Sequence, residues 1–329
     1  MFNIVAINKN FNQLPAGSMR EGFGRELAVL AQKNEQIVAL TADLLSSTRL
    51  NYFQKNFPHR LINVGVAEQN LLGVAAGLAM VGKIPVTTSF AVFQPGRNWE
   101  QLRQTVCLNQ LNVKLVSTHS GLSVGPDGAT HQALEDLALT LALPNLMVLS
   151  PCDELQTRQV LRAAIHHQGP VYIRLTRENS PQLTTWRSDF QLGRAQFFRL
   201  GKDVTLITTG IMAANVLLAA KILAERHQIE AQVINVHTLK PLDEDSILSS
   251  ITQTKGVVVI EEHQKFGGLT GLIANLLAAK LPRPLESVAV EDRFGQTGRT
   301  NELWEEYGLT VENIVKKAKL AISRSADHR

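Results

Sequence analysis

The carboxylic acid with the clearest chemical context is Glu68, in the string VGVAEQN at positions 64–70. A predicted strand ends there and an apolar helix follows, and ligands of parallel sheets bind beyond the carboxyl ends of the strands. Residues 71–81 are apolar on almost every side, so we expect the Glu68 carboxyl to be partly removed from water, which favours its protonated form. Glu68 is therefore a candidate for proton transfer to a ligand, or an acid that the helix dipole favours at a helix N-terminus.

A second polar segment, THSGLSVGPDGATHQ at positions 118–132, joins a predicted strand to a predicted helix. It carries His119, Asp127 and His131 among several glycines. Such loops present backbone N–H groups and polar side chains at a site. A loop that needs glycines only for its backbone conformation is the alternative. Histidines suit zinc by residue type, but no cysteine pair and no His-x-x-x-His spacing supports a metal site.

Aromatic and basic residues supply the remaining candidates. Phe90 and Phe93, in SFAVFQPGR at positions 89–97, could line a flat cofactor ring, although two phenylalanines are more often part of a core. Arg20, Arg174 and Arg177 could hold a phosphate. Each arginine alone is more typical of a solvated or structural position.

The elements that must position these residues alternate between short apolar runs and longer amphipathic ones. This alternation predicts parallel sheets covered on both faces, so we expect an α/β fold with two doubly wound domains. The expected divisions are an N-terminal arm at 1–17, a first domain at 18–180, a linker at 181–190 and a second domain at 191–329. The predicted strands are 37–41, 62–66, 84–90, 113–118, 146–150, 171–175, 204–208, 232–236, 256–260 and 285–290. The predicted helices are 20–33, 68–81, 96–108, 132–142, 153–166, 211–226, 269–279, 301–306 and 311–324.

The composition is that of an ordinary globular protein, with 44% apolar and 19% charged residues among 329, so extended disorder is not expected. The net charge of +4 is spread without a Lys/Arg block and only 5% of residues are aromatic, which argues against nucleic-acid binding. Two cysteines provide no disulfide framework. Neither a signal peptide nor a membrane span is predicted, and we expect a cytoplasmic protein that does not bind membranes.

Taken together, these segments resemble the C-terminal half of transketolase, a thiamine-diphosphate enzyme. The most specific string, GPDGATHQ at 125–132, is similar to the Asp-Gly-Pro-Thr-His loop of transketolases and deoxyxylulose-phosphate synthases, with Ala129 in place of Pro. The string GVAEQ at 65–69 resembles the segment with the family's catalytic Glu. The strings EEH at 261–263 and DRFGQTG at 292–298 resemble the family's C-terminal domain. The resemblance implies a pyrimidine-binding domain followed by a transketolase C-terminal domain.

The resemblance also implies a role for each candidate. Glu68 would hydrogen-bond N1′ of the aminopyrimidine and pass it a proton. Phe90 and Phe93 would pack around that ring, and Asp43, in TADL at 41–44, matches an acid close to the cofactor. The family moves a two-carbon ketol unit from a ketose phosphate to an aldose phosphate. The residues matched to the sugar hydroxyls and the reacting carbonyl are His119, Asp127 and His131, of which the two histidines are also catalytic candidates. The residues matched to the phosphate are Arg20, Ser47 and Arg177.

One family motif is missing. Full-length members carry Gly-Asp-Gly with a downstream Asn, which hold the metal and the diphosphate in a preceding domain, whereas this sequence has no Gly-Asp-Gly and no room for such a domain before Arg20. The resemblance therefore implies the second subunit of a split transketolase, with no metal ligand of its own. Thiamine diphosphate with Mg²⁺ or Ca²⁺ would be held mainly by a separate N-terminal subunit. We expect an α2β2 heterotetramer that is inactive without that partner.

Three alternatives stay open. An E1 β subunit of a 2-oxo acid dehydrogenase shares the two-domain layout and the Glu, but usually has a different His-containing loop. Deoxyxylulose-phosphate synthase shares the loop but is normally one full-length chain. A non-catalytic relative that kept the fold is the third alternative. The joint presence of Glu68, His119, Asp127 and His131 argues against it.

Two further expectations concern residues outside this set. Gly96 stands where many full-length transketolases carry a third aromatic in the pyrimidine pocket, a change that loosens the pocket or that Trp99 or a partner offsets. The second domain is expected to serve core and dimer packing, with His263 as a satisfied surface histidine.

Overall fold

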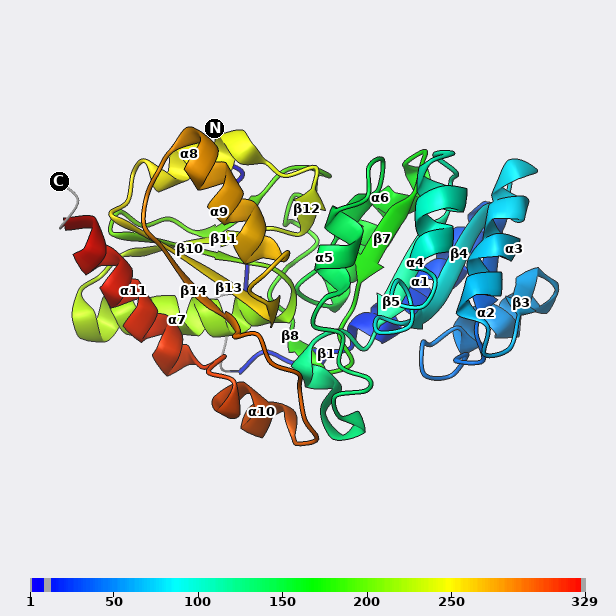
Figure 1. Cartoon of the computed structure of the whole chain (residues 1–329), viewed down its shortest axis with the longest axis horizontal. Helices are drawn as coiled ribbons and strands as arrows, with labels where there is room; N and C mark the ends of the chain where they lie inside the picture. Colours follow the sequence, from blue (N-terminus) through cyan, green and yellow to red (C-terminus); the bar gives the residue numbers. More distant parts are fainter. Residues whose placement is uncertain (1, 9–12, 327–329) are drawn as a thin grey trace.

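The structure is a computed structural model that describes residues 2–8 and 13–326. Two α/β units lie side by side along the long axis of the molecule (Figure 1). One is built on a seven-stranded sheet and the other on a five-stranded sheet. Each sheet has helices on both faces, which confirms the predicted α/β class. The domain limits drawn from the sequence stay predictions.

The first sheet is parallel except at one edge, and its strand order is β12-β6-β7-β5-β4-β2-β3. Its central strands are buried along their whole length, as is typical of a parallel sheet covered on both faces. Helices α1 and α6 pack together on one face, and α3 packs against η3 on the other. The strands are β2 (Ile37–Thr41), β3 (Leu61–Asn63), β4 (Ile84–Phe90), β5 (Lys114–Thr118), β6 (Met147–Leu149), β7 (Val171–Arg174) and β12 (Thr238–Lys240). The helices are α1 (Met19–Lys33), α2 (Asn51–Asn56), η2 (Pro58–Arg60), α3 (Glu68–Met80), α4 (Trp99–Gln101), η3 (Leu102–Cys107), η4 (Leu122–Asp127), α5 (Asp136–Leu141) and α6 (Glu154–His166).

The second sheet has the order β14-β13-β10-β11-β9, and only the edge strand β9 is antiparallel to its neighbour. Helices α7 and α11 cover one face, and α8 and α9 cover the other (Figure 1). The strands are β9 (Gln196–Arg199), β10 (Val204–Thr208), β11 (Ala231–Asn235), β13 (Gly256–Gln264) and β14 (Leu285–Val290). The helices are η5 (Gly210–Met212), α7 (Ala213–His227), α8 (Glu244–Ile251), α9 (Leu269–Lys280), α10 (Thr300–Glu306) and α11 (Val311–Ala326).

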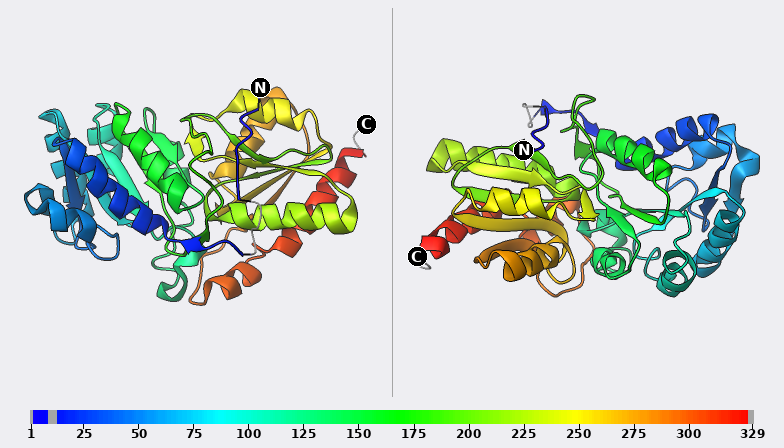
Figure 2. Two further views of the ribbon diagram at one scale, coloured as in Figure 1. Left: turned by 180° about the vertical axis from the view of Figure 1, so that it is seen from behind. Right: turned by 90° about the horizontal axis from the view of Figure 1, so that it is seen from above.

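Several segments tie the two units together. Strand β12 follows β11 in the chain but pairs with β6 at the edge of the first sheet, and Lys240 Nζ donates to the carbonyl oxygens of Leu141 and Leu143. The N-terminal segment 2–8 runs along the second unit (Figure 2). Its Val5 N–H donates to the carbonyl oxygen of Phe197 at 3.2 Å. Strand β1 (Ala16–Gly17) pairs with β8 (Ser180–Pro181). The buried apolar residues form two clusters, each of which includes residues of both units.

The structure differs from the predicted elements mainly at loops and short segments. The helix predicted at 96–108 begins at Trp99, since 91–98 form turns, and the helix predicted at 132–142 begins at Asp136. The strand predicted at 62–66 ends at Asn63, whose side-chain oxygen accepts from the N–H groups of Asp43 and Gly65. The short elements α2, α8, β9 and β12 were not predicted from the sequence. The two helices have only six and eight residues, about two turns, and the two strands only four and three, which is too few for an apolar period of either kind to be recognised.

Asp153 is a buried carboxylate that joins α6 to the segment after β8. Its Oδ1 accepts from the Gln156 N–H at 2.8 Å as the helix N-cap and from Thr184 Oγ1 at 2.8 Å. Its Oδ2 accepts from the Thr184 N–H at 2.6 Å. One side chain therefore satisfies both a helix end and a connecting segment.

We expect Asp153→Ala to lower the free energy of unfolding by about 2–3 kcal/mol, because it removes a helix cap and leaves the Thr184 N–H unpaired in a buried place. Urea denaturation followed by circular dichroism measures the change. Asp245→Ala removes an exposed acid from the first turn of α8 and serves as the control, with an expected change within about 0.5 kcal/mol. Equal losses in both variants would contradict the structural role of Asp153.

Candidate active site

Glu68 is the first residue of α3, directly beyond the carboxyl end of β3. Gly65 makes the turn between the two elements with a φ of +73°, which favours glycine. The Glu68 side chain is only 4% exposed, so the expected removal from water is confirmed. Arg97 Nη1 lies 3.4 Å from its Oε2, and Asn98 Nδ2 donates to its carbonyl oxygen at 3.1 Å. The segment after β4 therefore holds the start of α3.

Four rings that follow the ends of β4 and β5 form one aromatic cluster, made of Phe90, Phe93, His119 and His131. Phe90 stacks on His119 with 3.7 Å between ring centroids, and Phe90 and Phe93 are 6.0 Å apart. His131 meets Phe93 edge-on at 5.5 Å. The Arg97 guanidinium lies over Phe93 at 4.3 Å and so connects this cluster to Glu68.

His119 stands at the end of β5 with a φ of +59°, and its Nδ1 lies 2.8 Å from Thr118 Oγ1. The imidazole is 3% exposed. Burial, and after it the positive charges of Arg20 and Arg177, lower the pKa of His119 to about 3. His119 is therefore neutral at physiological pH and acts as a hydrogen-bonding group there.

The arginines matched to a phosphate lie together beside the aromatic cluster. Arg20 donates to the carbonyl oxygens of Ser47 at 3.0 Å and Arg177 at 3.1 Å, and Arg177 Nη1 donates to the Val124 carbonyl oxygen at 2.5 Å. Asp127 Oδ1 lies 3.8 Å from the same Nη1. Burial, and then the charges of Arg49 and Arg177, lower the pKa of Arg20. Two guanidinium groups held largely by neutral carbonyls form a site suited to an anion.

Two other candidates lie apart from this group. Asp43 stands in an exposed turn after β2, and both its N–H and its carboxylate bond to the Asn63 side chain. Its role near a cofactor stays a prediction. The prediction that Arg174 could hold a phosphate is wrong. Its buried guanidinium pairs with Asp136 at 2.9 Å and donates to the Glu262 carbonyl oxygen at 2.9 Å, which leaves it no access to a ligand.

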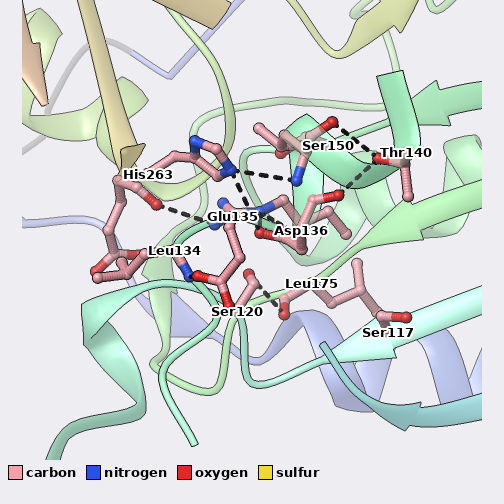
Figure 3. Close-up of polar contacts among 12 residues, drawn as sticks. Ser117, Ser120, Leu134, Glu135, Asp136, Thr140, Ser150, Leu175 and His263 are labelled. Carbon is pink, nitrogen blue, oxygen red and sulfur yellow. Dashed lines mark hydrogen bonds and ion pairs between the residues drawn. The ribbon is translucent and has the colours of Figure 1, made fainter. Parts of the chain in front are cut away.

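His263 is fully buried, so its expected surface position is wrong. Its Nε2 accepts from the Leu137 N–H at 3.2 Å, and its Nδ1 donates to the Gln264 carbonyl oxygen at 2.8 Å. The ring reaches from β13 to the start of α5, where it also lies 3.9 Å from Asp136 (Figure 3). His263 therefore joins the second unit to the segment that follows His131.

The local backbone explains why position 96 is a glycine and not an aromatic residue. A Cβ there would lie 2.2 Å from the Val92 carbonyl oxygen, so this backbone accepts no side chain at position 96. Trp99 does not fill the place of an aromatic at position 96, because its indole N–H donates to the Leu139 carbonyl oxygen at 2.8 Å, in α5.

No role was predicted from the sequence for three residues of this region, which are Arg97, Asn98 and Glu262, although Glu262 lies in the string EEH at 261–263. Arg97 and Asn98 follow the Phe93 segment, but nothing in the sequence pairs them with Glu68, about 30 positions earlier.

In the part of the chain that the structure describes, no three His, Cys, Asp or Glu side chains gather as a metal site. None of the described helices is long and apolar enough to cross a bilayer.

The family models for the transketolase pyrimidine-binding domain and the transketolase C-terminal domain match residues 16–182 and 193–314. The chain belongs to the transketolase family. This confirms the resemblance drawn from the sequence, including its correspondence to the C-terminal section of a split transketolase.

Three relatives of this transketolase-family chain match it over most of their length. A protein of Methanocaldococcus jannaschii named for a transketolase C-terminal section is 41% identical, over 91% of this chain and 94% of that protein. A 6-deoxy-6-sulfo-D-fructose transketolase subunit of Clostridium sp. (strain MSTE9) is 42% identical, over 91% of this chain and 93% of that subunit. A solved structure described as a split-gene transketolase, inactive β4 tetramer, is 42% identical with a TM-score of 0.86, over 94% of this chain and 100% of that chain.

The lowered pKa of His119 predicts a pH-dependent contribution to stability. Its folded-state pKa of about 3 lies below its ordinary value of 6.5, so between these pH values the unfolded chain binds the additional proton. Stability from neutral His119 is complete above pH 6.5 and is lost as the pH falls toward 3. We expect His119→Asn to reduce the slope of unfolding free energy against pH between 6 and 4 by up to about 1.4 kcal/mol per pH unit. Urea denaturation at several pH values measures this slope, and an unchanged slope would contradict a neutral buried His119.

Proposed function

We propose that the chain is the C-terminal subunit of a split transketolase, which transfers a two-carbon ketol unit from a ketose phosphate to an aldose phosphate with thiamine diphosphate. The observation that supports this most is the contact path from Glu68 through Arg97 to the aromatic cluster, with the Arg20–Arg177 pair beside it. Glu68, the aromatic cluster and Arg177 follow the ends of β3, β4, β5 and β7, parallel strands of one sheet, which is where ligands of such sheets bind. Arg20, in α1, joins them through its bond to the Arg177 carbonyl oxygen.

The residues around Glu68 fit an aminopyrimidine ring. The Arg97 guanidinium is a flat N–H donor that lies over Phe93 and donates to Glu68 Oε2. An aminopyrimidine with a protonated ring nitrogen is also a flat N–H donor and would make the same two contacts. The Arg97 side chain is 54% exposed and so has solvent into which it can move aside. When bound, thiamine diphosphate supplies the nucleophilic carbon that breaks and forms the carbon–carbon bonds.

The chain's own residues then have distinct tasks in this proposal. Glu68 holds and transfers one proton at its carboxylate oxygens, in a buried place where water competes little. Phe90 and Phe93 orient the flat ring. His119, with Nδ1 beside Thr118, offers Nε2 to a substrate hydroxyl, and His131 does so from the other side of the aromatic cluster.

The anionic end of the sugar is assigned to Arg20 and Arg177, with Asp127 and the Ser47 backbone beside them. Asp127 accepts hydrogen bonds from sugar hydroxyls, whereas the two guanidinium groups bind phosphate. This combination favours a hydroxylated, phosphorylated substrate over the 2-oxo acid of an E1 β subunit.

We also propose that a separate N-terminal subunit holds the diphosphate with Mg²⁺ or Ca²⁺, in an α2β2 assembly with this chain. The sequence supports this, because it lacks the family's Gly-Asp-Gly motif. The solved split-gene relative is described as inactive when it forms a β4 tetramer, which also supports a need for a partner. We propose that Asp43 contacts the cofactor within that assembly.

The partner requirement predicts the result of a reconstitution experiment. We expect the purified chain to show no two-carbon transfer with thiamine diphosphate and Mg²⁺. The same chain co-purified with a subunit that carries Gly-Asp-Gly and the downstream Asn should transfer the unit at rates typical of enzymes, about 1–10³ s⁻¹. A coupled assay of ketose phosphate consumption measures the rate. Full activity of the chain alone would refute the split-subunit proposal.

The proton role of Glu68 predicts a large loss in the reconstituted complex. Glu68→Gln keeps the shape and removes the transferable proton, so we expect the turnover number to fall by about 10²–10⁴-fold. Glu100→Gln changes an exposed acid in α4 and serves as the control, with turnover within about twofold of the unmodified complex. Steady-state kinetics at saturating cofactor measures both variants. Equal turnover in the two would remove Glu68 from the mechanism.

A further inference from the structure

A buried carboxylate of the second unit, Glu262 in β13, bonds directly to the loop that carries the sugar-site residues. Its Oε1 accepts from the Ser123 N–H at 2.7 Å and from the Trp304 indole N–H at 2.8 Å. Its Oε2 accepts from Ser123 Oγ at 2.9 Å. The side chain is 1% exposed, so these bonds form away from water, where breaking them costs most. Glu262 therefore joins β13, α10 and η4 at one point.

The loop depends on such an external contact because its own backbone is conformationally free. Gly121, Gly125 and Gly128 all have positive φ values, between +74° and +78°. Glycine enters this region at little steric cost but loses much conformational entropy when it is held there. A Cβ at Gly121 would lie 2.2 Å from Glu262 Oε2, so the carboxylate lies directly against the loop backbone.

Ser123 is connected to the arginine pair through two further hydrogen bonds. The next residue, Val124, accepts the bond from Arg177 Nη1 at 2.5 Å. Arg177 in turn accepts the bond from Arg20 at its carbonyl oxygen, at 3.1 Å. A shift of Ser123 away from Glu262 would move the Val124 carbonyl and release the Arg177 guanidinium.

We propose that Glu262 is a positioning residue for the anion-binding end of the site, through which the second unit sets the affinity for a phosphorylated sugar without touching it. This inference rests on the proposed function, since it assigns Arg20 and Arg177 to the substrate phosphate. It adds a task for the second unit beyond core and dimer packing.

Two substitutions separate the hydrogen bonds of Glu262 from its volume. Glu262→Gln keeps an oxygen that accepts from the Ser123 and Trp304 N–H groups, and its amide N–H can donate to Ser123 Oγ. Glu262→Met keeps a similar length but has no such acceptor. Glu286→Met is the matched control, because Glu286 in β14 is also buried but pairs with Lys317 and Arg324 of α11.

The test is steady-state kinetics of the reconstituted complex with two acceptors, an aldose phosphate and the same aldose without phosphate. We expect Glu262→Met to raise KM for the aldose phosphate about tenfold, with kcat and the KM of the unphosphorylated aldose within about threefold of the unmodified complex. Glu262→Gln is expected to restore KM for the aldose phosphate to within about threefold. Glu286→Met should lower the melting temperature and leave the ratio of the two KM values unchanged. Equal rises in both KM values, or no rise in either, would overturn the proposal.

A second readout needs no catalysis. Amide hydrogen exchange of residues 121–128 in the purified chain is expected to accelerate by about tenfold or more in Glu262→Met, because the Ser123 N–H loses its acceptor. Unchanged exchange would overturn the positioning role. If Glu262→Met does not fold, Trp304→Phe removes one donor to the carboxylate and is expected to raise KM for the aldose phosphate about fivefold or more, and a KM within about threefold of the unmodified complex would overturn the proposal. If the unmodified complex transfers no two-carbon unit, the proposed function fails while the exchange measurement still tests Glu262.

Discussion

The site depends on one geometric constraint, the parallel alignment of β2, β3, β4 and β5. Parallel strands bring their carboxyl ends to a common edge, and the residues directly after those ends share that edge. Glu68 follows β3, Phe90 ends β4 and His119 follows β5. The hydrophobic burial that stabilises the sheet therefore also sets the spacing of an acid, an aromatic ring and an imidazole.

Electrostatics at this edge separates two kinds of group. The acid and the flat rings lie on one side, where the charged Arg97 is half exposed and can move. The guanidinium groups of Arg20 and Arg177 lie on the other, where their charges help to keep His119 neutral. A neutral imidazole at this edge can donate or accept hydrogen bonds without a charge of its own. This division is what the substrate proposed above, with an anionic end and an uncharged reacting end, would require.

The second unit takes part in this arrangement through buried polar contacts. Glu262 bonds to the glycine-rich loop, and His263, the next residue, accepts from the backbone at the start of α5 (Figure 3). Asp136 in α5 pairs with Arg174, whose guanidinium also bonds to the Glu262 carbonyl oxygen. Strand β13 therefore holds both ends of the segment from Ser120 to Asp136. Removing one partner from such a buried network leaves the other polar groups without hydrogen bonds.

Local patterns in the sequence determined the α/β class, most strands of both sheets, and the places of Glu68, Phe90 and His119 beside strand ends, because apolar runs and glycines act over a few residues. Only the tertiary structure decided which charged groups are free to meet a ligand. Arg174 pairs with Asp136 across 38 positions, and His263 bonds to Leu137 across 126 positions. Strand β12, which follows β11 of the second sheet in the chain, likewise pairs with β6 of the first sheet, far away in sequence. Such pairings depend on which surfaces pack together after the elements form, and no local period in the chain encodes them.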